Sequence, residues 1–420
     1  MIHDLTKYMA GLGKNARIAA NILRLANSET RTAAILAMAK EVRSAVSVIL
    51  NANSLDMVAG ADKGLTPAML DRLKLTDERV ENIAQGLEAV AALPDPIGAE
   101  DKRWTRPNGL TIAKVRTPLG VIGMIYESRP NVTADAASLC IKSANACILR
   151  GGSEALHSNV AIHNTIVKGL KSTGLPETCV QYVGTTDRDA VGHMLSGLDG
   201  NIDLIIPRGG KGLVGRVQKD ARVPVLAHLE GRNHTYIHAD ASPDMARNII
   251  VNAKMRRTGI CGSTETLLLD KAALDMLPML SEALIKAGCE LRGDADACAK
   301  TGTIRPASEA DFMTEHLDAI LNIKIVDGLD TALAHIDQYG SNHTDAIITE
   351  NLEIAQTFLV KVDSAIVMHN ASTQYADGGE FGFGAEIGIA TGRLHARGPV
   401  GAQHLTSYKY QVFGTGQVRP

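Results

Sequence analysis

The sequence predicts an α/β protein with two domains, each containing a mainly parallel sheet, together with a small antiparallel β ribbon. Three observations support this fold class. Short apolar runs alternate with amphipathic segments from Gly120 onward, as strands and helices do in parallel sheets. The chain has 420 residues, and domains average about 150 residues. Its 39 glycines suit tight turns between strands and helices.

Composition and charge exclude several classes of protein. The 43 basic and 46 acidic residues leave a net charge of −3, without the positive field of a nucleic-acid-binding protein, and aromatic residues make up only 3%. The six cysteines show no paired spacing, and the sequence contains neither a leader at Met1 nor an apolar run long enough to span a membrane. We therefore expect a reduced, soluble, cytoplasmic protein that binds neither nucleic acid nor membrane.

The first part of the chain is expected to be helical. Residues 4–93 are rich in alanine, and Thr66 and Thr76 stand where N-caps are expected, each before spaced apolar residues. The sequence Pro-Asp-Pro-Ile-Gly at 94–98 ends this region. Later in the chain, His157 to Ser172 predicts another helix, which stops at a glycine and a proline.

Two segments predict the ribbon. Trp104 to Val115 alternates around the turn Pro107-Asn-Gly109, a strong hairpin signal, and the tail from Leu405 to Phe413 alternates in the same way. A long two-stranded ribbon is rarely stable alone. We expect hairpin and tail to form an intersubunit sheet in a homo-oligomer, with a dimer favoured; pairing within one monomeric chain is the alternative.

The two sheets are predicted from two series of apolar runs. The first series is Val121–Tyr126, Cys147–Leu149, Val180–Val183, Leu204–Ile206 and Val223–Leu226. The second is Thr235–Ile237, Leu267–Leu269, Ile323–Val326, Asp345–Ile348 and Ala365–Met368.

Cys261 is the strongest candidate for a nucleophile. It stands between Gly259 and Gly262, just after Arg256 and Arg257. Nearby cations and backbone N–H groups favour the reactive thiolate, and glycines let a substrate approach the backbone. The alternative is a small buried cysteine, which is our interpretation of the other five.

Two glycine-rich loops are candidate anion sites. Arg150-Gly-Gly-Ser153 and Arg208-Gly-Gly-Lys-Gly212 each follow a predicted strand and precede a helix, where open α/β sheets bind ligands. Neither matches the usual nucleotide fingerprints, so two solvated turns remain the alternative.

Asn131 and three histidines are weaker candidates. Asn131 follows the strand that begins at Val121 and offers an amide for an oxyanion, although an asparagine at that place is more often a cap. His228, His234 and His238 suggest zinc, but their spacing matches no metal motif, so we expect no metal site.

Taken together, the segments resemble the gamma-glutamyl phosphate reductase family, the acyl-phosphate branch of the aldehyde dehydrogenase superfamily. One departure is Gly262, where many relatives have asparagine. The resemblance covers nearly the whole chain and rests on Thr117–Thr133, Ile148–Ser153, Ile206–Gly212, His228–Gly231, Cys261 with Glu265-Thr266, Tyr339–Ala346, Glu380–Glu386 and His395–Pro399.

The resemblance implies NADPH-dependent reduction of L-glutamate 5-phosphate to L-glutamate 5-semialdehyde and phosphate, the second step of proline biosynthesis. Cys261 would form a thioester, and the hydride of the nicotinamide would then reduce it. Asn131 would belong to the oxyanion hole. Glutamate 5-kinase is a possible partner. The implied cofactor residues are Arg150, Gly151, Ser153, Arg208, Gly209, Gly210, Glu230 and Glu315, and the candidate substrate residues are Arg129, Arg256 and Arg257.

The resemblance also implies an aldehyde dehydrogenase-like arrangement of domains. Residues 1–98 and 118–230 would bind the cofactor, residues 231–399 would form the catalytic domain, and residues 99–117 with 400–420 would form an oligomerisation flap. Two other functions stay open. A cysteine hydrolase or acyltransferase would need a histidine beside Cys261, and none is identifiable from sequence; a non-catalytic nucleotide-binding module would tolerate loss of the thiol.

Overall fold

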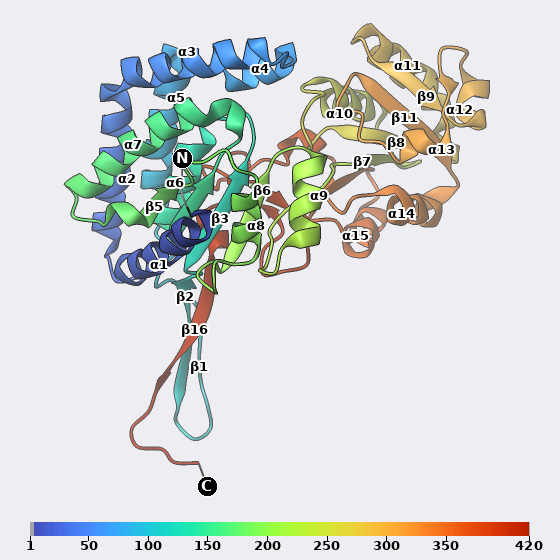
Figure 1. Ribbon diagram of the computed structural model, residues 1–420. Coiled ribbons are helices and arrows are strands. Elements are labelled where there is room, and N and C mark those ends of the chain that lie inside the picture. Colours follow the sequence, from blue (N-terminus) through green and yellow to red (C-terminus); the bar gives the residue numbers. More distant parts are fainter. Residues whose placement is uncertain (1–3, 420) are drawn as a thin grey trace. The chain divides into compact units, whose positions relative to one another are not determined.

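The computed structural model describes residues 4–419 and divides into two compact units. Unit 1 contains the residues up to Ala227, Gly382–Gly388 and the residues from Val400 onward; unit 2 contains His228–Phe381 and Ile389–Pro399. Each unit has a parallel sheet with helices (Figure 1). The predicted α/β class with parallel-rich sheets is therefore confirmed. Among the described residues, no helix is long and apolar enough to cross a membrane.

The sheet of unit 1 has four parallel strands in the order β5-β4-β3-β6. Because β3 lies between β4 and β6, the chain builds the sheet outward from β3 in both directions. The loops after these strands therefore meet at the place where open α/β sheets bind ligands. The strands are β3 (Val121–Tyr126), β4 (Ala146–Arg150), β5 (Val180–Tyr182) and β6 (Leu204–Arg208).

Helices accompany this sheet, and the predicted helical opening is confirmed. The Thr66 and Thr76 side chains accept hydrogen bonds from backbone amides three residues later, as N-caps do. A Cβ on Gly169 in α7 would lie 2.5 Å from the backbone nitrogen of Met38 in α2, so only glycine permits this close packing. The helices are α1 (Leu5–Leu23), α2 (Ser28–Ser44), α3 (Val46–Asp62), α4 (Pro67–Leu73), α5 (Asp77–Ala92), α6 (Val132–Lys142), α7 (Leu156–Ser172), α8 (Asp189–Leu195) and α9 (Lys211–Asp220).

One predicted strand of unit 1 is wrong. Val223–Leu226 runs beside β6 but forms only an isolated bridge, between Val225 and Ile205. The Pro224 carbonyl accepts from the Ile205 amide, and the Leu226 amide donates to the Ile205 carbonyl. Proline has no N–H, so the segment cannot continue as a regular ladder.

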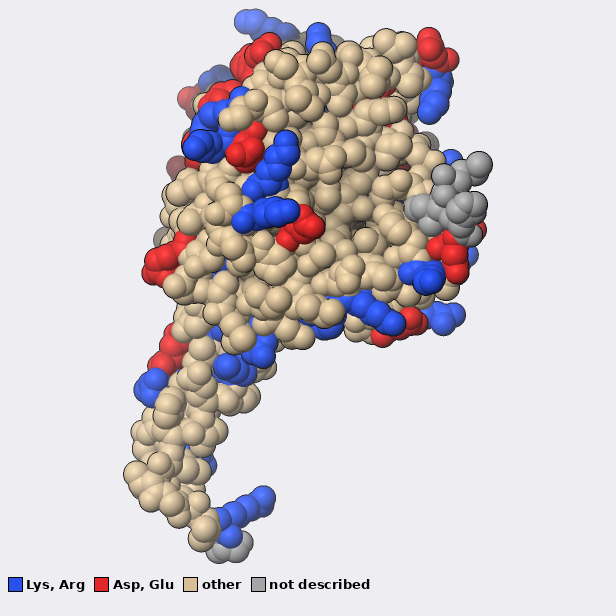
Figure 2. All heavy atoms as spheres, turned by 60° about the vertical axis from the view of Figure 1, so that its left-hand side comes forward, with Lys and Arg blue, Asp and Glu red and all other residues tan. Residues whose placement is uncertain are grey.

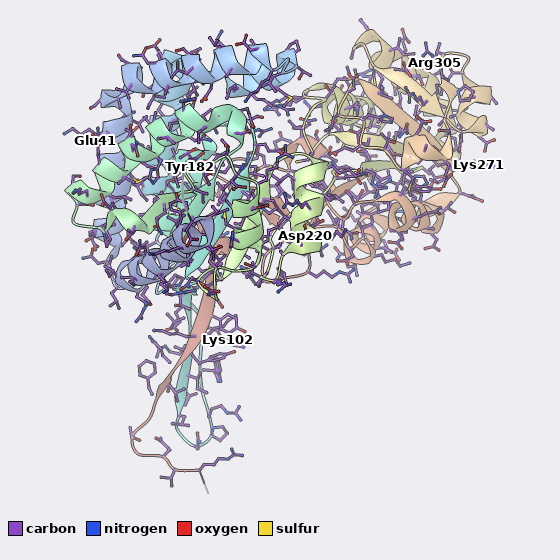
Figure 3. All side chains as sticks on the ribbon, viewed as in Figure 1. Glu41, Lys102, Tyr182, Asp220, Lys271 and Arg305 are labelled. Carbon is purple, nitrogen blue, oxygen red and sulfur yellow. The ribbon has the colours of Figure 1, made fainter. Side chains whose placement is uncertain are left out.

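The ribbon is a three-stranded antiparallel sheet that projects from unit 1 (Figure 1). Strands β1 (Glu100–Thr105) and β2 (Thr111–Pro118) form the hairpin, and β16 (Thr406–Phe413) pairs with β2 of the same chain. Gly109 has φ of 84° in the turn, a conformation that suits glycine. The ribbon side chains point away on both sides (Figure 3), and the face of the ribbon seen in Figure 2 is mostly uncharged.

The sheet of unit 2 has seven parallel strands in the order β10-β9-β11-β8-β7-β12-β13. All five strands predicted for the second series are present; the short outer strands β9 and β10 were not predicted. The strands are β7 (Asn233–Ile237), β8 (Thr264–Asp270), β9 (Glu290–Gly293), β10 (Arg305–Pro306), β11 (Ile320–Val326), β12 (Thr344–Ile348) and β13 (Ile366–His369), with a separate pair β14 (Ile389–Ala390) and β15 (Gly398–Pro399).

Strand β8 shows why this sheet is covered on both faces. Leu267 and Leu269 pack into a core with α10 and α11, whereas Leu268 packs into a second core with α14 and α15. Alternate residues of a strand point to opposite faces, so a continuous apolar run identifies a doubly covered strand. The helices of unit 2 are α10 (Pro243–Met255), α11 (Leu277–Lys286), α12 (Ala295–Lys300), α13 (Glu309–Phe312), α14 (Gly328–Tyr339) and α15 (Leu352–Lys361).

A buried ion pair joins the end of α10 to β8. Lys254 Nζ lies 2.8 Å from Glu265 Oε2, and the two side chains are 0% and 2% exposed. Burial raises the pKa of Glu265 to about 7 even though Lys254 favours the carboxylate, because removing a charge from water is costly. The pair brackets residues 256–263, the loop that contains Cys261.

This pKa predicts a pH dependence of stability. Glu265 has an ordinary pKa of 4.5 and a pKa of about 7 in the fold, so between these values the folded state binds more protons than the unfolded state. The contribution of Glu265 to stability therefore falls as pH rises through this window. Urea unfolding of the wild type and of Glu265→Gln, measured from about pH 4.5 to about pH 8, tests this.

Titratable groups common to both proteins cancel, so the difference in unfolding free energy between wild type and variant reports Glu265 alone. This difference should shrink as pH rises, because the contribution of Glu265 falls. A difference that stays constant with pH would contradict the assigned pKa.

Candidate active site

Cys261 lies in the loop between α10 and β8, and the buried amide of Asn233 fixes this loop. Asn233 Nδ2 donates to the carbonyl oxygens of Cys261, at 2.6 Å, and Ser263, at 2.9 Å. Its Oδ1 accepts from the Thr344 amide at 3.2 Å. One side chain of β7 thus binds both the nucleophile loop and the start of β12. Asn233 was not predicted from the sequence.

The loop also packs closely against its neighbours. A Cβ on Gly231 would lie 2.2 Å from the Cys261 carbonyl oxygen, so no other residue fits at Gly231 without moving the loop. Gln374 Nε2 donates to the carbonyl oxygens of Ala253 and Arg257. The Cys261 backbone is therefore held on several sides, while the residue is partly exposed.

Two histidines lie beside the thiol. One ligand atom from each of His228, Cys261 and His343 lies within 4.8 Å of the other two, and the two imidazole rings meet edge to face at 5.0 Å. The sequence identified no histidine partner for Cys261; the structure corrects this. A cysteine hydrolase or acyltransferase needs a histidine beside its thiol, and this site meets that requirement.

The other histidines considered for zinc have separate partners. The His234 Nδ1 lies 2.9 Å from the buried carboxylate of Asp345. The His238 Nδ1 lies 3.2 Å from the Thr349 hydroxyl. His228, His234 and His238 therefore do not form the cluster that their spacing suggested.

Both candidate glutamates of unit 2 belong to or contact the segment 230–232, which lies beside the Cys261 loop. Glu315 Oε1 accepts from the Gly231 amide at 2.9 Å. Glu230 lies 3.6 Å from Arg232 Nε. The Gly231 contact with Cys261 thus connects this acidic turn to the thiol loop.

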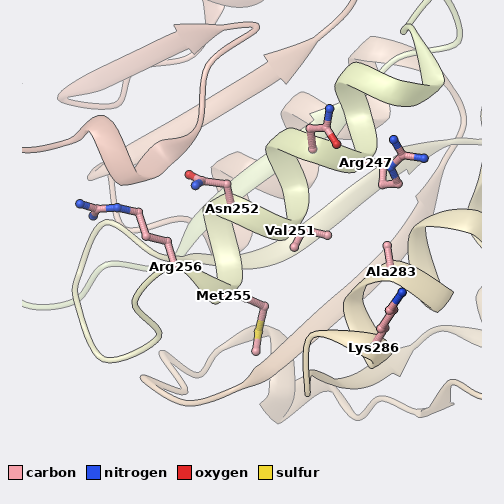
Figure 4. Close-up of a pocket in the computed structure, with 8 residues that line it drawn as sticks. Arg247, Val251, Asn252, Met255, Arg256, Ala283 and Lys286 are labelled. Atoms are coloured by element: carbon pink, nitrogen blue, oxygen red, sulfur yellow. The ribbon is translucent and has the colours of Figure 1, made fainter.

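Arg256 lines an open groove of about 580 Å³ between α10 and α11. Figure 4 shows Arg256 apart from Arg247 and Lys286, with apolar Val251 and Met255 between them. Cys261 does not line this groove. Arg257 is exposed, and its carbonyl oxygen is bound by Gln374.

In unit 1, internal carboxylates occupy the loops after the strands. Glu127 Oε2 accepts from the Gly210 amide at 2.8 Å, at the start of α9, and a Cβ on Gly209 would meet the same oxygen at 2.5 Å. Glu154 Oε1 accepts from the amide and hydroxyl of Ser128, whose φ is 43°. The helix start predicted to hold phosphate is thus bound by a carboxylate of the same unit.

Arg150 is buried at the end of β4. Its Nη1 donates to the Gly151 carbonyl at 2.8 Å and its Nη2 to the Thr186 carbonyl at 3.4 Å, while Nε has no partner among the described residues. Ser153, just beyond, is exposed. An unsatisfied buried guanidinium nitrogen beside an exposed helix start is compatible with an anionic ligand.

Asn131 begins α6, but its side chain does not cap the helix. Instead Nδ2 donates to Asp135 Oδ2 at 2.8 Å, which leaves the second amide hydrogen for another acceptor. Burial raises the pKa of Asp135. Arg129 lies two residues earlier in the same loop. Of the predicted residues, Asn131, Arg129 and the two glycine loops belong to unit 1, whereas Cys261, both glutamates, Arg256 and Arg257 belong to unit 2.

A family profile and the sequences of known proteins both match this chain. The profile of the Aldehyde dehydrogenase family matches residues 65–322. The gamma-glutamyl phosphate reductase of Caulobacter vibrioides is 61% identical over 98% of this chain and 100% of its own length. That of Hyphomonas neptunium is 60% identical, covering 99% of this chain and 97% of its own.

Solved structures of known proteins are also similar to this chain. The gamma-glutamyl phosphate reductase of Thermotoga maritima has a TM-score of 0.96 at 42% identity, covering 99% of this chain and 100% of its own. An engineered glycolyl-CoA reductase with bound NADP+ shares the fold, with a TM-score of 0.66 at 16% identity over 96% of both chains. The chain therefore belongs to the aldehyde dehydrogenase family and, within it, to the gamma-glutamyl phosphate reductases.

Proposed function

We propose that the chain reduces L-glutamate 5-phosphate to L-glutamate 5-semialdehyde and phosphate with NADPH, the second step of proline biosynthesis. The observation that carries this proposal is a partly exposed cysteine on a backbone held by hydrogen bonds, in a chain 61% identical over its length to a gamma-glutamyl phosphate reductase. The cytoplasm is the expected location.

Covalent catalysis suits this site. Cys261 Sγ attacks the acyl carbon, the bond from that carbon to the phosphate oxygen breaks, and phosphate leaves as the thioester forms. The imidazoles of His228 and His343 offer acceptors for the thiol proton within 4.8 Å. NADPH, when bound, supplies the hydride that reduces the thioester carbon, and cleavage of the C–S bond then releases the aldehyde.

The surrounding residues orient the reaction. Asn131 is assigned to the oxyanion, through the amide hydrogen that Asp135 does not bind. Arg129, Arg256 and Arg257 are assigned to the substrate's anionic groups. Unit 1 is assigned to the cofactor and unit 2 to the chemistry, and Glu230 and Glu315 of unit 2 are also assigned to the cofactor.

Arg150 and Ser153 are the best-supported cofactor residues. The guanidinium of Arg150 provides positive charge and an unpartnered Nε, and Ser153 carries no charge that would repel a 2′-phosphate. The adjacent acid Glu154 is hydrogen-bonded to Ser128. The Arg208-Gly-Gly loop fits less well, because Glu127 already binds its Gly210 amide.

The proposed assembly is a homo-oligomer, with a dimer favoured. The ribbon exposes large side chains that water solvates poorly, including Tyr408 at 49%, Tyr410 at 57% and Val412 at 58%. Alternation puts these three on one face of β16. Since β16 pairs with β2 of its own chain, the partner would cover this face or extend an edge of the ribbon.

Glutamate 5-kinase is a second proposed partner, because its acyl phosphate product is labile.

Loss of the thiol should abolish the reaction. Cys261→Ser should fold normally but reduce L-glutamate 5-phosphate at least about a thousandfold more slowly, because a hydroxyl is a much weaker nucleophile. NADPH oxidation followed by absorbance measures this. Cys298→Ser, which changes another partly exposed thiol, should retain activity. Near-normal turnover by Cys261→Ser would refute the mechanism, and NADPH-independent product formation would favour the hydrolase.

The cofactor assignment predicts a selective effect at Ser153. Ser153→Glu should lower kcat/KM for NADPH at least about tenfold more than for NADH, because the new carboxylate repels the 2′-phosphate. Ser153→Gln, of similar size and no charge, serves as the matched control. Equal losses with both cofactors in Ser153→Glu would place the 2′-phosphate elsewhere.

The ribbon assignment predicts the oligomeric state. Wild-type protein at micromolar concentration should have the light-scattering mass of a dimer or larger oligomer, and the double change Tyr410→Asp and Val412→Asp should dissociate it by burying charge at the contact. Lys409→Asp with Gln411→Asp alters the opposite face of β16 and should have less effect. A monomeric wild type would overturn the assignment.

A further inference from the structure

His228, Cys261 and His343 are brought together by the order of the strands in unit 2. Cys261 precedes β8, His228 precedes β7 and His343 immediately precedes β12, and these three strands are neighbours in the order β8-β7-β12. Parallel strands all begin at the same edge of a sheet. Two imidazoles and a thiol therefore converge, with their ligand atoms within 4.8 Å of one another.

His228 is oriented as metal-binding histidines usually are. Its Nδ1 lies 3.0 Å from the Ile389 carbonyl oxygen. A carbonyl oxygen only accepts, so Nδ1 carries the hydrogen and Nε2 of the neutral ring keeps its lone pair. A hydrogen bond from the second ring nitrogen to a backbone carbonyl fixes both the tautomer and the ring orientation of a ligand.

His343 gives independent evidence for a ligand. The residue is 0% exposed, and its Nδ1 lies 2.8 Å from the Thr344 hydroxyl. Its Nε2 is buried and, among the described residues, has no hydrogen-bond partner. A buried polar atom without a partner costs free energy, and a bound cation would satisfy it.

We propose that these three side chains form a site for a soft divalent cation, Zn²⁺ above all, that reversibly blocks the nucleophile. The inhibitory consequence rests on the proposed function, in which Cys261 attacks the acyl phosphate. Imidazole and thiolate are the ligands Zn²⁺ prefers, whereas Mg²⁺ and Ca²⁺ prefer oxygen. Three protein ligands leave the fourth tetrahedral position to water, which can enter because Cys261 is partly exposed.

Zinc binding requires the three ligand atoms to move slightly closer together. Ligand atoms around tetrahedral zinc lie roughly 3.4–3.6 Å apart, so a gap of 4.8 Å closes by about 1 Å. The Cys261 side chain is the movable ligand, since Asn233 and Gly231 fix only its backbone. On binding, Zn²⁺ displaces the thiol proton to solvent and both rings bind as neutral imidazoles, so no electron is transferred. The metal-bound sulfur then cannot attack the acyl carbon.

Metal titration of the full-length, chelator-stripped protein tests the site directly. Zn²⁺ affinity is measured by competition with a chromophoric chelator, and Co²⁺ reports the Cys–metal bond through its thiolate charge-transfer absorption. We expect one Zn²⁺ per chain, protection of Cys261 from alkylation, and inhibition that excess chelator reverses; Mg²⁺ should do none of these. His343→Gln and His228→Gln should each weaken Zn²⁺ binding at least about tenfold, and Cys261→Ser should lose the Co²⁺ charge-transfer band. His193→Gln, in unit 1, is the matched control and should bind like the wild type.

Two results would overturn the proposal. Unchanged affinity in both His228→Gln and His343→Gln would mean that the thiol binds metal alone, and Zn²⁺ binding unaffected by Cys261→Ser would place the metal elsewhere. The binding and alkylation measurements need neither substrate nor NADPH. If the proposed reaction is not observed, these measurements can still be interpreted. If the enzyme is active but binds no Zn²⁺, the proposed metal site is wrong and the proposed function stands.

Discussion

The loop that contains Cys261 depends on one buried amide. Asn233 is fully buried and binds the carbonyls of Cys261 and Ser263 and the amide of Thr344. These are backbone groups of segments far apart in the sequence, and each would be left unpaired in the interior if the side chain were lost. The amide fixes the nucleophile loop against β7 and also fixes the start of β12, where His343 stands. The buried Lys254–Glu265 ion pair bridges the two ends of the same loop.

The two units use their sheets differently. In unit 1 the loops that carry candidate ligands follow the strands, at the edge where α/β proteins usually bind cofactors. In unit 2 the thiol and its histidines precede the strands, at the opposite end of a parallel sheet. A backbone held by hydrogen bonds, with the residue partly exposed, suits both roles assigned to Cys261. The proposed reaction needs the thiol to meet an acyl carbon, and the proposed cation site needs it to meet the neighbouring imidazoles.

Much of the fold could be predicted locally, but the surroundings of the nucleophile could not. Continuous apolar runs such as 267–269 identified the buried strands, because a doubly covered strand is apolar at every position, and the Asn-Gly turn at 108–109 identified the hairpin. The strand predicted at 223–226 failed because Pro224 cannot donate a hydrogen bond. His343 was missed because its nearness to Cys261 follows from the order of β8, β7 and β12, which no local pattern contains.

Mass spectrometry of the trapped enzyme shows directly whether Cys261 carries the acyl group. The protein is mixed with L-glutamate 5-phosphate without NADPH, quenched in acid and digested. The account predicts a glutamyl adduct on the peptide containing Cys261, formed with release of phosphate and discharged when NADPH is added before the quench. An adduct on another residue, or reduction by an enzyme that never acquires one, would contradict it.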